Sequence, residues 1–153
     1  MTNLKELIAE YLRDAKLMQV ATSQNNKPWI ATVWYVNDED WNLYFISRKN
    51  RRHSLEINNN PYVAGAIVLP HTKGSGEKVR GLQFEGKAEE AKGKALKKAR
   101  NLYLIKYSSA EDIPLKKLED PKFIATFYVI HPKAFILFDE VNFPDNPRQE
   151  LKL

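Results

Sequence analysis

Short segments rich in β-branched and aromatic residues, separated by turn-forming residues, constrain the fold of this chain more than any other feature of its sequence. The run over residues 29–36 is almost unbroken in this respect, as in a strand that is buried on both faces. Polar turn residues stand on either side of it, at 24–28 and 37–40. Most neighbouring segments are close enough in sequence to pair with one another, which favours an antiparallel sheet.

Read along the whole chain, these patterns predict seven strands and four helices. The expected strands cover residues 16–23, 29–36, 41–47, 62–69, 80–91, 123–131 and 134–139, the last two forming a hairpin around His131-Pro132-Lys133. The expected helices cover residues 3–14, 51–58, 92–106 and 112–120. Strands dominate and the regular alternation of a doubly wound sheet is missing. We therefore expect a mainly β fold with peripheral helices (α+β), an antiparallel barrel that is closed or nearly closed.

Length and composition narrow the class of protein. The 153 residues fit one domain, 1–153. The absence of cysteine excludes disulfides, thiolate catalysis and cysteine-ligated metal sites. No segment approaches the roughly 18 apolar residues of a membrane helix, and the charged residues among the first twenty do not fit a signal peptide. We expect a cytoplasmic protein with no membrane partner.

Several common kinds of active site find no support. The three histidines, His53, His71 and His131, lack metal-ligand spacing, so no metal site is predicted. Gly74-Ser75-Gly76 lies between two expected strands, whereas a phosphate-binding glycine motif needs a helix after it. The consecutive acids 38–40 are expected to point outward from a turn, and so cannot face each other as a catalytic pair. A hydrolase is therefore poorly supported.

One group of residues favours an anionic ligand. An aromatic strand leads directly into Arg48, Lys49, Arg51, Arg52 and His53, where a helix is expected to begin. The start of a helix offers unpaired N–H groups and the positive end of the helix dipole. Guanidinium groups bind phosphate through two hydrogen bonds at once. Cations beside aromatic strands predict a ligand with a phosphate and a planar ring, although a basic loop that faces only water has the same composition.

A second basic cluster, over residues 92–106, keeps nucleic acid open as an alternative partner. Binding of single-stranded nucleic acid would require exposed aromatic side chains next to the cations. The apolar run 29–36 is too continuous for a strand expected to face solvent, so nucleic acid is disfavoured. A solvated helix face explains this cluster equally well.

The order of these residues resembles the pyridoxamine 5′-phosphate oxidase-like, FMN-binding split barrels. The resemblance is carried by Pro-Trp-Ile-Ala-Thr-Val-Trp-Tyr-Val at 28–36, Leu-Tyr-Phe-Ile-Ser at 43–47, Arg-Arg-His-Ser-Leu at 51–55, Asn-Asn-Pro-Tyr-Val-Ala at 59–64 and Arg-Gly-Leu-Gln-Phe-Glu-Gly-Lys-Ala at 80–88. It covers residues 16–91 and is weaker towards the C-terminus. Within this family, the chain is most similar to small members of uncharacterised function.

The resemblance implies a homodimer with one FMN in each of two clefts at the subunit interface, and an oxidoreductase acting on a small-molecule substrate or electron donor. The implied cofactor residues are Thr32, Val33 and Trp34 along the flavin ring, Ile46 and Ser47 through their backbone, Arg51, Arg52 and His53 at the phosphate, and Gln83 from the fifth strand. The resemblance identifies no catalytic residue.

The sequence departs from the family at two places. Many members have Ser-Arg-Lys where this chain has Arg51-Arg52-His53. The C-terminal residues with which the oxidase binds its substrate are not recognisable here, which speaks against pyridoxamine phosphate oxidation itself. A split barrel that holds a deazaflavin or haem, and a dimer that has lost its cofactor, remain as alternatives.

Overall fold

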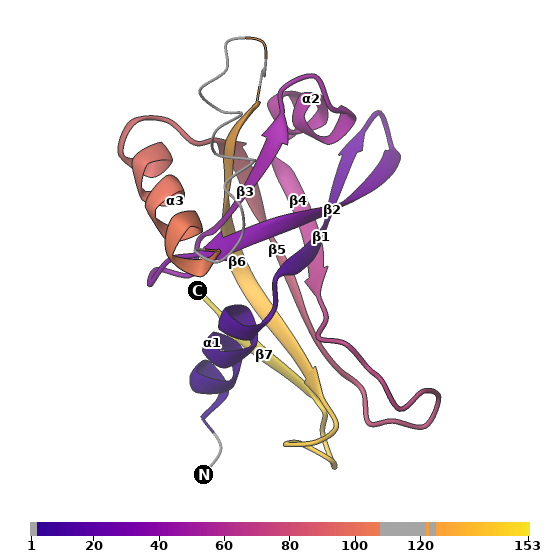
Figure 1. Cartoon of the computed structure of the whole chain (residues 1–153). Helices are drawn as coiled ribbons and strands as arrows, with labels where there is room; N and C mark the ends of the chain where they lie inside the picture. The colour runs from indigo at the N-terminus through magenta and orange to yellow at the C-terminus, as the bar shows by residue number, and fades with distance from the viewer. Residues whose placement is uncertain (1–2, 108–121, 123–124) are drawn as a thin grey trace.

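A computed structural model describes residues 3–107, 122 and 125–153, and the strands within them form a seven-stranded antiparallel sheet (Figure 1). The strands are β1 (Leu17–Gln24), β2 (Lys27–Asn37), β3 (Leu43–Arg48), β4 (Tyr62–Ile67), β5 (Arg80–Glu90), β6 (Ala125–Asp139) and β7 (Arg148–Lys152). Their order is β3-β2-β1-β4-β5-β6-β7, and an additional pairing between β3 and β6 closes the first six into a ring. The prediction of an antiparallel barrel is confirmed.

Three helices in the described residues lie outside the ring: α1 (Leu4–Asp14), α2 (Arg52–Asn59) and α3 (Gly93–Lys106) (Figure 1). They match three of the four predicted helices, and the fourth, at 112–120, lies outside the described residues. None of these helices combines the length and the apolar character that a membrane crossing would require.

The apolar side chains of the described residues form two cores. The larger fills the barrel and extends to α1, whose Ile8, Tyr11 and Leu12 are buried. The Tyr11 hydroxyl donates to the backbone oxygen of Arg80, which ties α1 to the start of β5. The second core lies between α3 and the outer face of the barrel, where Tyr103 packs with Phe127 of β6. Together, these cores hold the helices against the barrel.

The C-terminal strands differ from the prediction. Within the described residues, the expected hairpin at His131-Pro132-Lys133 is instead one continuous strand, β6, with a bulge in its pairing to β5 between Glu85 and Gly86. Proline lacks the N–H group that a regular ladder would use, and a bulge accommodates it. A Cβ at Gly86 would lie 2.3 Å from the backbone oxygen of His131, so only glycine fits this crossing. The seventh strand is β7, which the patterns did not predict.

The prediction that the run 29–36 is buried on both faces is wrong. Ile30 is 61% exposed and Trp34 is 50% exposed. The residues on either side of Trp34, Val33 and Tyr35, are buried in the barrel. The strand thus has one face in the core and one apolar face outside it. Periodicity did not reveal the outer face because its residues are as apolar as the inner ones.

Two further residues near the β2–β3 turn depart from the prediction. Trp41 was placed in a strand, but it lies in the turn with a φ of 71°, and β3 begins only at Leu43. Asp38 was expected to point outward with its acidic neighbours, but it is buried and accepts hydrogen bonds from Asn42 and the hydroxyl of Tyr44. Asp38 therefore organises the turn, and it forms an ion pair with Lys98 of α3.

Candidate functional site

The polypeptide leaves β3 at Arg48 and begins α2 at Arg52, and this junction holds most of the residues predicted to bind a phosphate. Arg51 is the N-cap of α2, but its side chain makes no capping hydrogen bond. Without a side-chain cap, N–H groups in the first turn of the helix remain available to an anion. We call Ser47, Arg51, Arg52, His53 and Ser54 the α2 start.

Arg52 is already engaged within the protein. Its Nε donates to Glu56 at 2.7 Å, and its guanidinium lies 4.4 Å from the ring centre of Trp29. Glu56 is buried and also accepts from the hydroxyl of Thr22 at 2.5 Å. These hydrogen bonds, from Thr22 first and then from Arg52, lower the pKa of Glu56. Through the contact of Arg52 with Trp29 and that of Glu56 with Thr22, α2 packs against the β1–β2 hairpin.

Among the described residues, Arg51 differs from Arg52 in being available to a ligand. Its side chain is exposed and forms no hydrogen bond or ion pair with any residue that the structure describes. Lys49, by contrast, is paired with Glu90 at 2.7 Å. Of the two arginines predicted to hold a phosphate, Arg51 can turn towards a ligand without breaking a contact among the described residues.

The hydroxyl and imidazole groups of the α2 start form a hydrogen-bonded chain. The Nε2 of His53 lies 2.6 Å from the Oγ of Ser47, and the hydroxyl of Ser54 donates to the same Oγ at 3.0 Å. Burial lowers the pKa of His53, and the positive charge of Arg51 lowers it further. The imidazole is therefore neutral near pH 7. Buried Tyr128 brings its hydroxyl close to Ser54 without completing a hydrogen bond in the described part of the chain.

The remaining predicted residues lie on the barrel wall. Thr32 pairs with Gln19, Gln19 with Ala66 and Ala66 with Gln83, so these four residues form one row across β2, β1, β4 and β5. The rows on either side place further residues on the same face, which are apolar on β1, β2 and β4, with exposed Glu85 on β5 beside Ala64. We call this face the outer strip: Leu17, Gln19, Ala21, Ile30, Thr32, Trp34, Ala64, Ala66 and Gln83.

The structure therefore divides the predicted cofactor residues into groups. Ser47, Arg51, Arg52 and His53 meet at the α2 start, whereas Thr32, Trp34 and Gln83 share the outer strip. Three strand spacings place Gln83 roughly 14 Å from Thr32. The side chain of Val33 is in the barrel core, and that of Ile46 packs against the core under α3. Only backbone atoms of these last two could reach a ligand on the outer strip.

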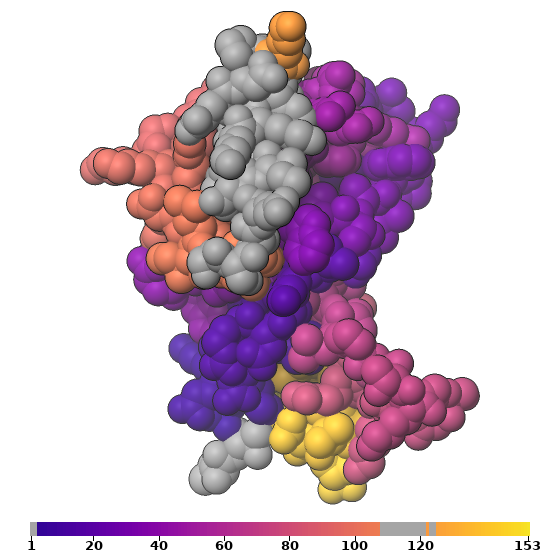
Figure 2. All heavy atoms as spheres, viewed as in Figure 1, coloured from indigo at the N-terminus to yellow at the C-terminus, as the bar shows by residue number. Residues whose placement is uncertain are grey.

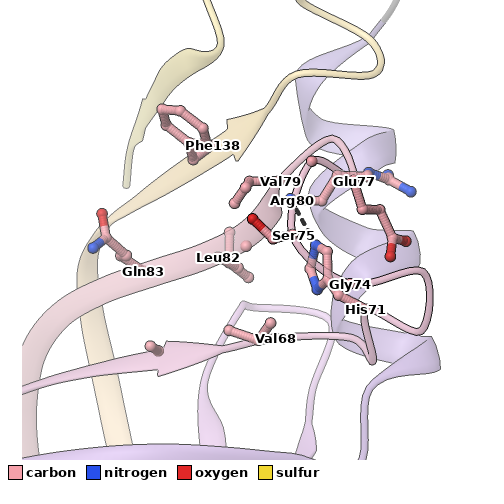
Figure 3. A pocket seen from close by; sticks show the side chains of 13 residues that line it. Val68, His71, Gly74, Ser75, Glu77, Val79, Arg80, Leu82, Gln83 and Phe138 are labelled. Atoms are coloured by element: carbon pink, nitrogen blue, oxygen red, sulfur yellow. Dashed lines mark hydrogen bonds between the residues drawn. The ribbon is translucent and has the colours of Figure 1, made fainter.

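A cleft of about 630 Å³ opens beside Gln83, between the barrel wall and the β4–β5 loop (residues 68–79) (Figure 3). Its wall is mainly apolar, with Val68, Leu82 and Phe138 among its lining residues. In Figure 2 the loop projects from the body of the molecule in pink. His71 of the loop accepts a hydrogen bond from the backbone N–H of Arg80 at 3.1 Å, which ties the loop to β5. This volume lies in the range of small-molecule sites.

Sequence reasoning missed several residues of these sites. Gln19 and Ala66 complete the row between Thr32 and Gln83, and Ser54 and Tyr128 complete the polar group around Ser47. The alternation within β1 and β4 could have placed Gln19 and Ala66 on one face, but it does not show which strands become neighbours. Nothing in the local sequence signals that Tyr128, from a distant strand, approaches Ser54.

Comparison with known proteins relates the chain to one family. A family model described as pyridoxamine 5′-phosphate oxidase matches residues 4–137. A UPF0306 protein of Pasteurella multocida is 32% identical over 102 residues, which are 66% of this chain and 67% of the relative.

Solved structures share the fold. General Stress Protein 26 of Bacillus anthracis superposes with a TM-score of 0.69 at 21% identity, over 99% of this chain and all (100%) of that protein. HutZ, the haem storage protein of Vibrio cholerae, superposes with a TM-score of 0.67 at 16% identity, over 86% of this chain and 91% of that one. At these identities, the likeness shows a common architecture.

Proposed function

Because this chain belongs to the pyridoxamine 5′-phosphate oxidase family, we propose that it binds FMN and serves as a flavin-dependent oxidoreductase on a small molecule. One observation carries the proposal: the exposed guanidinium of Arg51 stands at a helix start with no side-chain cap. A phosphate dianion fits this combination of charge and free N–H groups. Ser47 and His53 lie at the same junction.

The planar part of the cofactor has a suitable surface on the outer strip. Thr32 and Trp34 are exposed there, and small residues on β1 and β4 keep the wall beside them flat. When bound, a flavin ring itself supplies the chemistry of hydride transfer. The role proposed for the chain is to fix the phosphate at the α2 start and to shield the ring from water.

We further propose that a second copy of the chain covers the outer strip. Ile30 and Trp34 are large apolar residues, and in a single copy their exposed fractions are 61% and 50%. Exposed apolar side chains on one face of a strand, here on either side of Thr32, are typical of protein interfaces. In such a dimer, Gln83 of one copy would approach the cofactor held by its partner, although within its own copy it lies three strand spacings from Thr32.

A nucleic-acid interface is less well supported by the outer strip. Its exposed aromatic residue, Trp34, is accompanied on β1, β2 and β4 by apolar and uncharged polar residues. Nucleic-acid sites place lysine or arginine beside the stacking aromatics. Residues 29–36 are partly exposed, so their burial is no longer an argument against nucleic acid. The argument against it is now that the outer strip contains no lysine or arginine.

The proposal is tested on the purified full-length chain by visible absorption and by titration with FMN. We expect a flavin spectrum and binding in the micromolar range or tighter. The variant Arg51→Ala should bind FMN about tenfold more weakly, since it loses a charge-assisted hydrogen bond. Riboflavin, which lacks the phosphate, should bind both proteins equally.

Arg148→Ala is the matched control, because Arg148 is an exposed arginine on β7 and should leave FMN affinity unchanged. Failure of the wild-type chain to take up FMN would overturn the proposal. Haem and a deazaflavin are titrated in parallel, since HutZ shares the fold. A Soret band with tight haem binding, or preference for the deazaflavin, would replace FMN as the cofactor.

A further inference from the structure

We propose that binding of the FMN phosphate at the α2 start is coupled to the uptake of one proton by His53. The inference rests on the function proposed above, because it concerns the group that would hold the phosphate. It goes further by assigning to Ser47 and His53 a joint role: together they switch between a state closed to anions and a state that donates to them.

We assign to neutral His53 the tautomer with its proton on Nδ1, in which the imidazole holds the proton of Ser47 and keeps it from an anion. A hydroxyl has one proton, and the 2.6 Å contact between its Oγ and Nε2 of His53 is the shortest that Ser47 makes with a side chain in the described residues. The hydroxyl of Ser54 donates to the same Oγ. In the assigned tautomer Ser47 donates its own proton to Nε2 at 2.6 Å, in preference to the backbone oxygen of Arg48 at 3.3 Å. Nε2 then carries no proton and has nothing to donate.

Protonation of His53 reverses this contact. Nε2 becomes a donor to Ser47, whose oxygen has two lone pairs and can accept from His53 and Ser54 together. The Ser47 proton is then released for a phosphate oxygen. A positive charge also appears next to Arg51. A hydrogen-bond donor and a charge are thus gained by one protonation, and both stabilise a dianion.

The groups around His53 keep it neutral until an anion arrives. Burial is the larger cause of the lowered pKa of His53; of the charged groups at α2, Arg51 at the N-cap opposes protonation and Glu56 favours it. From β3, Ser47 and the ring of Phe45, whose centre is 6.3 Å away, contribute no charge. From β6, Tyr128 is uncharged near pH 7, since burial raises the pKa of its hydroxyl. A phosphate would offset the charge of Arg51, and the pKa of His53 should then rise.

The test measures proton uptake directly. FMN is titrated into the full-length protein by calorimetry at pH 7, in buffers with different heats of ionisation. We expect uptake approaching one proton per FMN, and none with riboflavin. The phosphate monoester of FMN has a pKa near 6, so a small fraction of it still carries a second proton at pH 7. Binding of the dianion by cations releases that proton. Net proton uptake on binding therefore cannot come from the ligand.

Two variants of His53 separate charge from structure. His53→Gln keeps a neutral polar side chain, so it should abolish proton uptake and weaken FMN binding about tenfold at pH 6.5, with little change at pH 8.5. His53→Lys carries a constant charge and should bind FMN tightly without uptake. The NMR titration of the His53 ring should move to higher pH when FMN is added to the wild-type protein.

The outcomes are distinguishable. FMN binding without proton uptake, with the same pH dependence in His53→Gln, would overturn the coupling and leave the proposed function standing. If none of these proteins binds FMN, both are overturned. Uptake that persists in His53→Gln would assign the proton to another group and would also contradict this inference.

Discussion

At the scale of single residues, the two arginines that open α2 have different roles although they are adjacent in sequence. Arg52 contacts Glu56 and Trp29, whereas Arg51 makes no such contacts within the described residues. We expect Arg52→Ala to lower the free energy of unfolding by about 1–2 kcal/mol, since buried Glu56 loses a partner. Arg51→Ala should change it by less than about 0.5 kcal/mol. Urea unfolding measures both, and equal losses would contradict this division of roles.

Glu56 should also give the protein a defined sensitivity to acid. Its pKa is lowered in the folded state, so near pH 4 the unfolded chain binds more protons and stability rises with pH. The contribution is fully present above the unfolded pKa of about 4.3 and is lost as pH falls through the folded pKa, by about 1.4 kcal/mol for each unit of difference. In Glu56→Gln, unfolding free energies between pH 6 and 3 should therefore fall less steeply than in the wild type. Parallel curves would refute this.

The contacts of single residues were harder to predict from the sequence than their positions. The basic residues before α2 could be recognised from their position at a helix start. Their individual roles could not, because the partners of Arg52 come from the β1–β2 hairpin and its own helix. Asp38 was misjudged for a similar reason: its buried position depends on Tyr44 and on Lys98 of α3, and neither contact follows from a run of three acids.

At the scale of elements, the bulge between β5 and β6 depends on Gly86. We expect Gly86→Ala to destabilise the fold by about 1–3 kcal/mol, because the added methyl group would press on the backbone of His131 and Pro132. Gly81→Ala, in the same strand, is the matched control: its nearest neighbour would be a methyl of Val68 at 3.7 Å, an ordinary contact. Thermal unfolding compares the two, and equal melting temperatures would show that the bulge tolerates a side chain.

Element positions were the most predictable part of the fold. The first five strands and three helices have the expected locations within a few residues, because hydrophobic period and turn residues are local signals. The last third was less accessible. His131-Pro132-Lys133 has the composition of a turn, but the neighbouring strand β5 continues past it and keeps β6 extended. Tertiary pairing thus overrode the local signal.

At the scale of the whole molecule, the outer strip predicts the assembly state. Ala66 lies in its central row, between Gln19 and Gln83. We expect Ala66→Arg to convert a dimer into a monomer, because it would place a charge within an apolar interface. Ile105→Arg, at an exposed position of α3, is the control and should remain dimeric. Light scattering during size-exclusion chromatography measures both masses. A monomeric wild type, or a dimeric Ala66→Arg protein, would contradict the proposed interface.

The fifteen-residue strand β6 has a consequence for how this protein is made. Its first half pairs with β3 and its second half with β7, while β5 runs along most of its length. A chain emerging from the ribosome cannot complete the ring until Ala125 and the residues after it have been synthesised. Until then, the nascent polypeptide exposes both its inner and its outer apolar surfaces, and chaperones that recognise such surfaces have most of the translation time in which to bind it.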